Sequence, residues 1–160
     1  MQNNKYVKLH SLLRMFAALL AIAVFISMFC AKQMVHSEFD RVFVDFNNGA
    51  FFGDEAYKNG NVFAFIGYLL VIVGGLAGLA FVFIDELIGK DLTKKLSFLV
   101  GGLMVLGSIA IFLFSPVFKA LNDLNSSDFH TAAGPIVFGC LAVVAGAANI
   151  AAPILEDKGF

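Results

Sequence analysis

Charged residues are absent from four long stretches of this 160-residue chain. The stretches are Met15–Ala31, Val62–Ile84, Leu96–Phe118 and Thr131–Leu155. Apart from the boundary residue Arg14, we expect no Asp, Glu, Lys or Arg inside a membrane span. Proton pumps, ion-coupled transporters and rotary proteolipids need an ionisable group within the membrane. The sequence therefore argues against these classes.

Cysteine and histidine are also scarce. Cys30 and Cys140 form no C-x-x-C motif, which argues against membrane thiol oxidoreductases, and their predicted difference in depth argues against a disulfide. The histidines, His10, His36 and His130, show no H-x-x-x-H spacing, whereas a zinc site needs three or four ligands. No nucleophile–base pair is evident either. We expect no metal, no cofactor and no enzymatic activity, and the net charge of −1 argues against nucleic acid as a partner.

Apolar residues dominate what is present. They make up 59% of the chain, with a mean hydropathy of +0.85, as in polytopic membrane proteins. A helix needs about 20 apolar residues to cross a hydrocarbon core of roughly 30 Å, and backbone polar groups in lipid must be paired within their own segment. We predict an all-α integral membrane four-helix bundle, as a single transmembrane domain over residues 1–160. The predicted spans are about 11–34, 62–84, 96–116 and 131–155.

The alternative for the first span is a cleaved signal peptide, because Lys5, Lys8 and Arg14 precede its apolar run. Met28 and Phe29 stand where signal peptidase needs small residues, so we expect an uncleaved helix. With the N-terminus inside, the inner segments carry seven Lys and Arg residues and the outer segments carry four. This imbalance predicts a multi-pass protein of a plasma or inner membrane with both termini cytoplasmic.

The first outer segment, 35–61, carries more apolar side chains than a loop needs. They are Phe39, Val42, Phe43, Phe46, Phe51 and Phe52. Spacings of three and four residues predict a short amphipathic helix over 38–47. The alternative over 38–52 is a hairpin, because Asn48-Gly49 is a strong two-residue turn signal. In either form these apolar side chains have to be covered, so we take them as partner-binding candidates.

The second outer segment, 117–130, repeats this pattern on a smaller scale. Ser115-Pro116 is suited to begin a new helical turn, after which Phe118 and Leu121 share one face. We therefore expect the chain to bend at Pro116 and to lie along the membrane interface as a second short amphipathic piece.

Small residues gather on single faces of two predicted spans. Gly74 and Gly78 form a G-x-x-x-G pair, and Gly139, Gly146 and Asn149 lie along one stripe of the last span. Close backbone approach across small residues supplies packing energy in lipid. We predict that these faces pack helices within the bundle, with a homo-oligomer seam as the alternative. Asn149, the only amide within a predicted span, is expected to hydrogen-bond across the bundle.

The order of segments is similar to that of claudin-like four-helix proteins. Both plans have cytoplasmic termini, a long first outer segment, a tight inner turn, here over 85–95, and a shorter second outer segment. The resemblance covers topology alone. The chain has no Trp and no Cys between residues 31 and 139, whereas the claudin signature combines a tryptophan-containing motif with two outer-loop cysteines. It therefore implies no functional residue here.

The leading functional hypothesis is a non-enzymatic membrane protein that acts as a partner-binding, scaffold or accessory subunit. The partner would be another membrane subunit or a second copy of the chain, bound through the outer segment 35–58 and the glycine faces, with membrane lipids around the spans. The alternative is an oligomeric pore or channel subunit. Its path would be lined by Ser27, Ser108 and Asn149, which are scattered along the spans.

Overall fold

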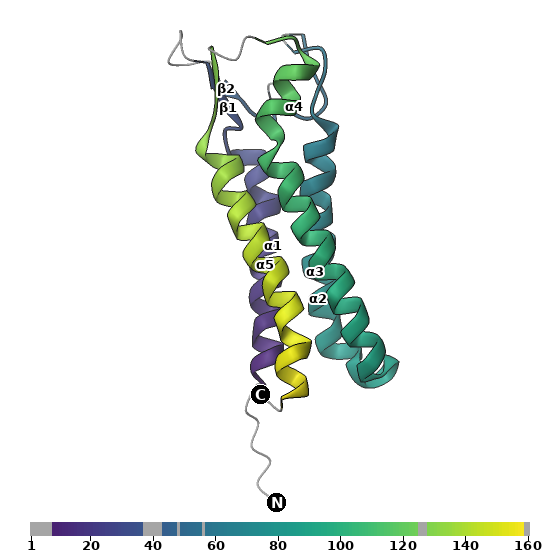
Figure 1. The fold of residues 1–160 in the computed structure, drawn as a ribbon. Coiled ribbons are helices and arrows are strands. Elements are labelled where there is room, and N and C mark those ends of the chain that lie inside the picture. Colours follow the sequence, from purple (N-terminus) through teal and green to yellow (C-terminus); the bar gives the residue numbers. More distant parts are fainter. Residues whose placement is uncertain (1–7, 37–42, 48, 56, 125–127, 159–160) are drawn as a thin grey trace, which may run out of the picture.

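The computed structural model describes residues 8–36, 43–47, 49–55, 57–124 and 128–158. Within these ranges, four helices are long and apolar enough to cross a membrane. They are α1 (Leu9–Cys30), α2 (Val62–Ile88), α3 (Lys90–Phe112) and α5 (Ala133–Asp157). Figure 1 shows these helices side by side in one bundle. The prediction of an all-α four-helix membrane bundle is confirmed, and the chain is a multi-pass membrane protein.

The four long helices form a ring in sequence order, in which each helix packs against its two neighbours. α1 and α3 each lie against both α2 and α5, and α2 also touches α5 across the diagonal. Only Gly89 separates α2 from α3, and its φ of +85° is a conformation that glycine adopts without strain. We call the end with this turn the terminal end, because α1 begins and α5 ends there too (Figure 1).

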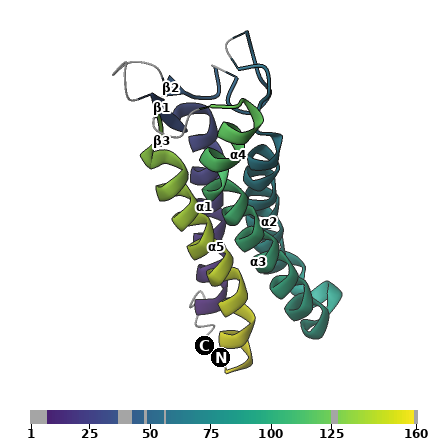
Figure 2. The same ribbon diagram turned by 45° about the horizontal axis from the view of Figure 1, so that its top comes forward.

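The opposite end, the cap end, carries three strands and a short helix. The strands are β1 (Met34–His36), β2 (Phe43–Val44) and β3 (Phe129–Thr131), and they form an antiparallel sheet in the order β2-β1-β3. The short helix is α4 (Phe114–Leu121). Figure 2 shows the sheet above the ends of α1 and α5, with α4 beside it. The described parts of 31–61 and 113–132 are called the cap below.

The predicted helix over 38–47 is wrong where the structure describes it. Phe43 and Val44 lie in a strand, and the chain turns after them. The hairpin around Asn48-Gly49 is also wrong, because Phe43 and Val44 pair with Val35 and Met34. Residues 38–42 and Asn48 lie outside the described residues. Side chains along a strand alternate between the two faces of the sheet, and this alternation accounts for the strand better than helical spacing does. Met34 and Val44 are partners in the sheet, and both are fully buried against the bundle.

The predicted break near Pro116 is present. α3 ends at Phe112, Leu113 is the N-cap of α4, and Pro116 lies in the first turn of α4, where its missing N–H removes no helical hydrogen bond. Phe114 and Phe118 face the bundle, fully buried, with ring centroids 5.5 Å apart. The short helix is therefore a continuation of the core beyond α3.

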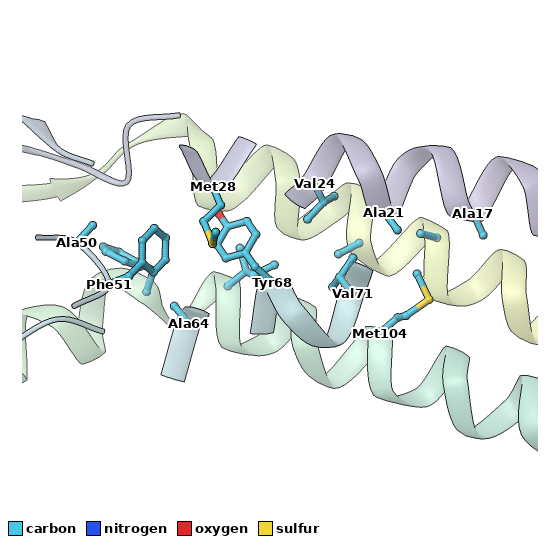
Figure 3. Packing of buried hydrophobic residues seen from close by; sticks show 14 of the residues in the cluster. Ala17, Ala21, Val24, Met28, Ala50, Phe51, Ala64, Tyr68, Val71 and Met104 are labelled. Carbon is cyan, nitrogen blue, oxygen red and sulfur yellow. The ribbon is translucent and has the colours of Figure 1, made fainter. Parts of the chain in front are cut away.

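The core runs without interruption from the cap into the bundle. Figure 3 shows buried side chains from Ala50 and Phe51 in the cap, through Tyr68 and Val71 of α2, to Met104 of α3. All five are fully buried. The cap and the bundle therefore share one hydrophobic core, and the centre of the bundle is filled by side chains.

Candidate functional site

The structure divides the six partner-binding candidates between core and surface. Phe39 and Val42 lie outside the described residues, and Phe43 lies in the edge strand β2. Phe51 is fully buried, with its ring centroid 5.6 Å from that of Phe114 and 5.7 Å from that of Tyr68. Its assignment as a partner-binding residue is therefore wrong. Hydrophobic periodicity did not distinguish Phe51 from its neighbour, because both are apolar loop residues.

Phe46 and Phe52 of the cap instead lie in an aromatic row with Phe29 of α1 and Phe65 of α2. We define the aromatic row as Phe29, Phe46, Phe52 and Phe65. The ring centroids of Phe29 and Phe46 are 4.7 Å apart, those of Phe46 and Phe52 are 6.4 Å apart, and those of Phe52 and Phe65 are 4.7 Å apart. Phe52 is 59% exposed and Phe29 is 44% exposed. The row therefore presents ring surface that the described residues leave uncovered.

Side-chain amides hold the loop before α2 in place. Asn61 is fully buried; its Oδ1 accepts from the N–H of Ala64 at 3.1 Å, which caps α2, and its Nδ2 donates to the carbonyl of Phe114 at 3.0 Å. Asn59 donates to the carbonyl of Leu121 at 2.7 Å and accepts from Asn122 at 2.8 Å. The loop is thus fastened to α4. An Asn directly before an apolar run is a helix-start signal, so the sequence pattern alone identifies Asn61 as a candidate N-cap.

Tyr57 covers the other side of this loop. Its ring centroid lies 5.2 Å from that of Phe118 and 6.4 Å from that of Phe129. Burial of the phenol raises the pKa of Tyr57, and the negative charge of Asp54 raises it further. The hydroxyl therefore stays neutral at physiological pH, and the ring acts as packing surface.

The predicted small-residue faces all lie against other helices of the same chain. An added Cβ at Gly74 would lie 2.5 Å from Cγ of Met104, and one at Gly146 would lie 2.9 Å from the carbonyl oxygen of Gly101. A Cβ at Gly139 would lie 2.7 Å from the ring of Phe112. These contacts leave no room for a second copy on those faces.

Asn149 lies at the crossing of three helices. It is 1% exposed, its Nδ2 donates to Sδ of Met104 at 3.1 Å, and an added Cβ at Gly78 would lie 2.2 Å from its Oδ1. The hydroxyls of Ser27 and Ser108 donate to carbonyls of their own helices, those of Val24 and Val105, both at 2.6 Å. These polar groups are therefore satisfied by local contacts, and they do not line up along a path.

The terminal end holds ionisable groups that the sequence-based spans excluded. The candidate spanning helices extend beyond those predicted spans, to Asp85 in α2 and to Asp157 in α5. Arg14 is 1% exposed inside the bundle, and one of its terminal nitrogens lies 3.7 Å from Oε2 of Glu156. The same nitrogen donates to Oγ of Ser97 at 3.5 Å. The uncharged runs end at Ile84 and Leu155, directly before Asp85 and Glu156, so hydropathy alone placed these acids outside the predicted spans.

Further charges surround this pair. Lys90 lies 3.9 Å from Oε1 of Glu156, and Lys94 forms an ion pair with Asp157. Asp85 lies within electrostatic range of the Arg14 guanidinium. We call Arg14, Asp85, Lys90 and Glu156 the charged cluster. Ionisable groups within a span are costly, and they usually mark either a functional site or a contact that holds helices together.

Metal ligands are not gathered at either end. Within the described ranges, no group of three or more His, Cys, Asp or Glu residues is placed to hold a metal ion. Cys30 and Cys140 are free and exposed. His130 is the central residue of β3 and pairs with Val35 in the sheet, while His10 lies at the terminal end, 6% exposed.

Comparison with known proteins finds no relative of this chain. No family model matches the sequence, and searches of curated proteins and of solved structures find no match. The resemblance to claudin-like proteins therefore remains one of topology, and the function has to be inferred from this chain's own residues.

Proposed function

We propose that the chain is a non-enzymatic membrane protein that binds a partner through its cap, as a scaffold or accessory subunit. The partner is another membrane subunit or a second copy of the chain. The observation that carries the proposal is the aromatic row, in which Phe52 is 59% exposed on a loop outside the spans. Exposed rings next to a well-packed core are typical of the anchor positions of protein interfaces.

The rigidity of the cap supports this role. Phe51 fixes the loop from inside, and Asn59 and Asn61 fasten the same loop to α4 through three hydrogen bonds of 3.0 Å or less. A surface that is already ordered loses less conformational entropy on binding. Phe52 is thus presented by a supported backbone, and it needs no rearrangement to meet a partner.

The interior of the bundle counts against the alternative, a pore through one copy. Tyr68, Val71 and Met104 are fully buried in its centre, and the polar groups of Ser27, Ser108 and Asn149 are engaged locally. An ion needs a continuous row of polar groups or water to cross a membrane. An oligomeric pore between copies would have to use the outer faces, where exposed residues such as Leu19 and Val73 are apolar.

Association in mild detergent tests the proposal. Phe52→Asp should lower recovery of the partner about tenfold or more, because an interface anchor contributes roughly 2 kcal/mol or more. Leu121→Asp is the matched control, since Leu121 is also an exposed apolar cap residue, 43% exposed, but lies on α4 away from the row. Mass spectrometry identifies a foreign partner, and light scattering detects a second copy. Equal recovery from both variants and the wild type would refute the proposal.

The orientation in the proposal follows from the Lys and Arg bias, with both termini cytoplasmic and the cap outside. Single cysteines test it in a background with Cys30 and Cys140 replaced by Ser. An impermeant thiol reagent added from outside should label Lys58→Cys, in the cap, and should not label Lys95→Cys, at the start of α3. Both lysines are exposed. The reverse labelling would place the cap in the cytoplasm.

A further inference from the structure

A cavity of mixed charge lies at the terminal end, between the start of α1 and the ends of α2 and α5. Its ionisable lining residues are Lys8, His10, Asp85, Lys90 and Glu156. Val82 and Phe83 of α2 complete one wall, and Phe83 is 75% exposed on the outside of the bundle. The cavity therefore combines both signs of charge with an apolar margin, at the level where a spanning helix leaves the hydrocarbon.

Two buried polar atoms at this place have no hydrogen-bond partner among the described residues. They are Oδ1 of Asp85, which lines the cavity, and Nε of Arg14, whose side chain is 1% exposed. Glu156 is already paired, because Arg14 lies 3.7 Å and Lys90 lies 3.9 Å from its two oxygens. A buried carboxylate oxygen without a donor is unfavourable. Asp85 is thus the group in this cavity that a hydrogen-bond donor would stabilise.

We propose that the cavity binds the headgroup of a phospholipid that carries both a primary ammonium and a phosphate, as in phosphatidylethanolamine. The ammonium donates to Oδ1 of Asp85. The phosphate lies at the rim, near Lys8 and Lys90, whose side chains are exposed. The acyl chains follow Val82 and Phe83 out of the cavity. This proposal does not rest on partner binding, since the cavity and the cap lie at opposite ends of the bundle (Figure 1).

The charges of the cavity select this class over other headgroups. A headgroup with a phosphate and hydroxyls but no amine would bring a net negative charge next to Asp85 and Glu156, and its hydroxyls offer the unpaired acceptor only a neutral donor, which makes a weaker hydrogen bond than an ammonium. A choline headgroup has the same formal charges as ethanolamine, but its nitrogen carries no N–H to donate. A lone metal cation would leave Lys8 and Lys90 as like-charged neighbours. Ethanolamine matches both the sign pattern and the missing donor.

Lipid titration of the purified wild-type chain, followed by native mass spectrometry, tests the headgroup preference. We expect phosphatidylethanolamine to bind about tenfold more tightly than phosphatidylcholine of the same acyl chains, since one charge-assisted hydrogen bond separates the two. Phosphatidylglycerol should also bind more weakly than phosphatidylethanolamine. Equal binding of the ethanolamine and choline lipids, or tightest binding of phosphatidylglycerol, would overturn the proposal.

Asp85→Asn assigns the preference to the cavity. It keeps the size of the side chain and removes its charge, so the tenfold preference for ethanolamine over choline should disappear. Asp91→Asn is the matched control, because Asp91 is an exposed carboxylate in the first turn of α3 at the same end. This variant should keep the wild-type preference for ethanolamine over choline. A preference that survives in Asp85→Asn would overturn the assignment. If that variant fails to fold, the wild-type comparison of ethanolamine with choline still decides.

Discussion

The two ends of the bundle are closed by different interactions. At the cap end, the ring of Phe51 packs against those of Phe114 and Tyr68, with centroids 5.6 and 5.7 Å away. At the terminal end, buried Arg14 reaches Glu156 on α5 and Ser97 on α3. Burial of apolar rings involves no charge, so it is not screened at moderate ionic strength. A buried ion pair depends instead on each partner being present and charged.

This difference separates what each end is able to do. The cap end is rigid because its core continues into the bundle, so its outer rings are free to meet a partner. The terminal end carries charges that the described residues do not fully satisfy, as the unpaired Oδ1 of Asp85 shows. One end therefore offers an exposed apolar surface, and the other offers a charged cavity.

Arg14→Met should produce the largest effect. It leaves Glu156 and Asp85 without their buried cation, and breaking a buried pair by removing one partner costs about 3–5 kcal/mol. Thermal unfolding in detergent measures the loss. Lys94→Met is the control, because Lys94 and Asp157 are substantially exposed and the loss of such a pair costs at most ~1 kcal/mol. Equal losses would show that Arg14 is not a buried structural charge.

Phe51→Ala should come next, from the cap end. Removing a fully buried ring costs about 3–5 kcal/mol. We rank this loss second because neighbouring rings can partly collapse into the space that Phe51 leaves. Phe52→Ala should cost about 1 kcal/mol, since its ring is mostly exposed and loses chiefly its aromatic contacts. The Phe51 loss should not change with ionic strength. A cap loss that does depend on salt would contradict the contrast between the two ends.

A pair of adjacent glycines tests the packing between the ends. A Cβ at Gly101 would lie 2.5 Å from Cγ1 of Ile150 and 2.8 Å from the carbonyl oxygen of Gly146, so Gly101→Ala should destabilise by about 1–3 kcal/mol. A Cβ at Gly102 meets nothing within 4 Å, so Gly102→Ala should be neutral or stabilising by up to ~1 kcal/mol. Equal unfolding temperatures would mean that α3 and α5 are not in close contact there.

The smallest effect should be a pH dependence of the cap. The folded-state pKa of Tyr57 is raised, so the unfolded chain loses this proton first, and the stabilising contribution is complete below the unfolded pKa of about 10 and is lost as pH rises above it. Between about pH 9 and about pH 11, the unfolding temperature of the wild type should fall slightly more than that of Tyr57→Phe. Identical profiles would show that the phenol titrates as it does in water.

The sequence was sufficient for the spans and insufficient for the cap. The uncharged runs predict the helices because lipid requires long apolar segments with internal backbone pairing. The sheet was missed because its strands have two or three residues each, and β1 pairs with β3 from the far end of the chain. Local spacing carries no information on such a pairing. The apolar spacing around Phe43 therefore favoured a helix.

The individual residues were missed for the same reason. Gly60 stands two residues before α2, and nothing in its sequence neighbourhood predicts that an added Cβ would lie 2.2 Å from the backbone of Phe51. Arg14 reads as a positive charge at a membrane boundary, whereas in the fold it meets Glu156 from the other end of the chain. Contacts between residues so distant in sequence depend on how the helices are arranged, and one sequence does not reveal that arrangement.

The central claim, that the cap presents its aromatic row to a partner, is tested most directly by photo-crosslinking in the native membrane. A benzophenone-bearing amino acid at position 52 replaces one exposed aromatic side chain with another, and the same residue at position 121 serves as the control. We expect a single protein adduct, to one membrane subunit or to a second copy of the chain, from position 52 and none from position 121. Adducts to lipid alone from position 52 would contradict it.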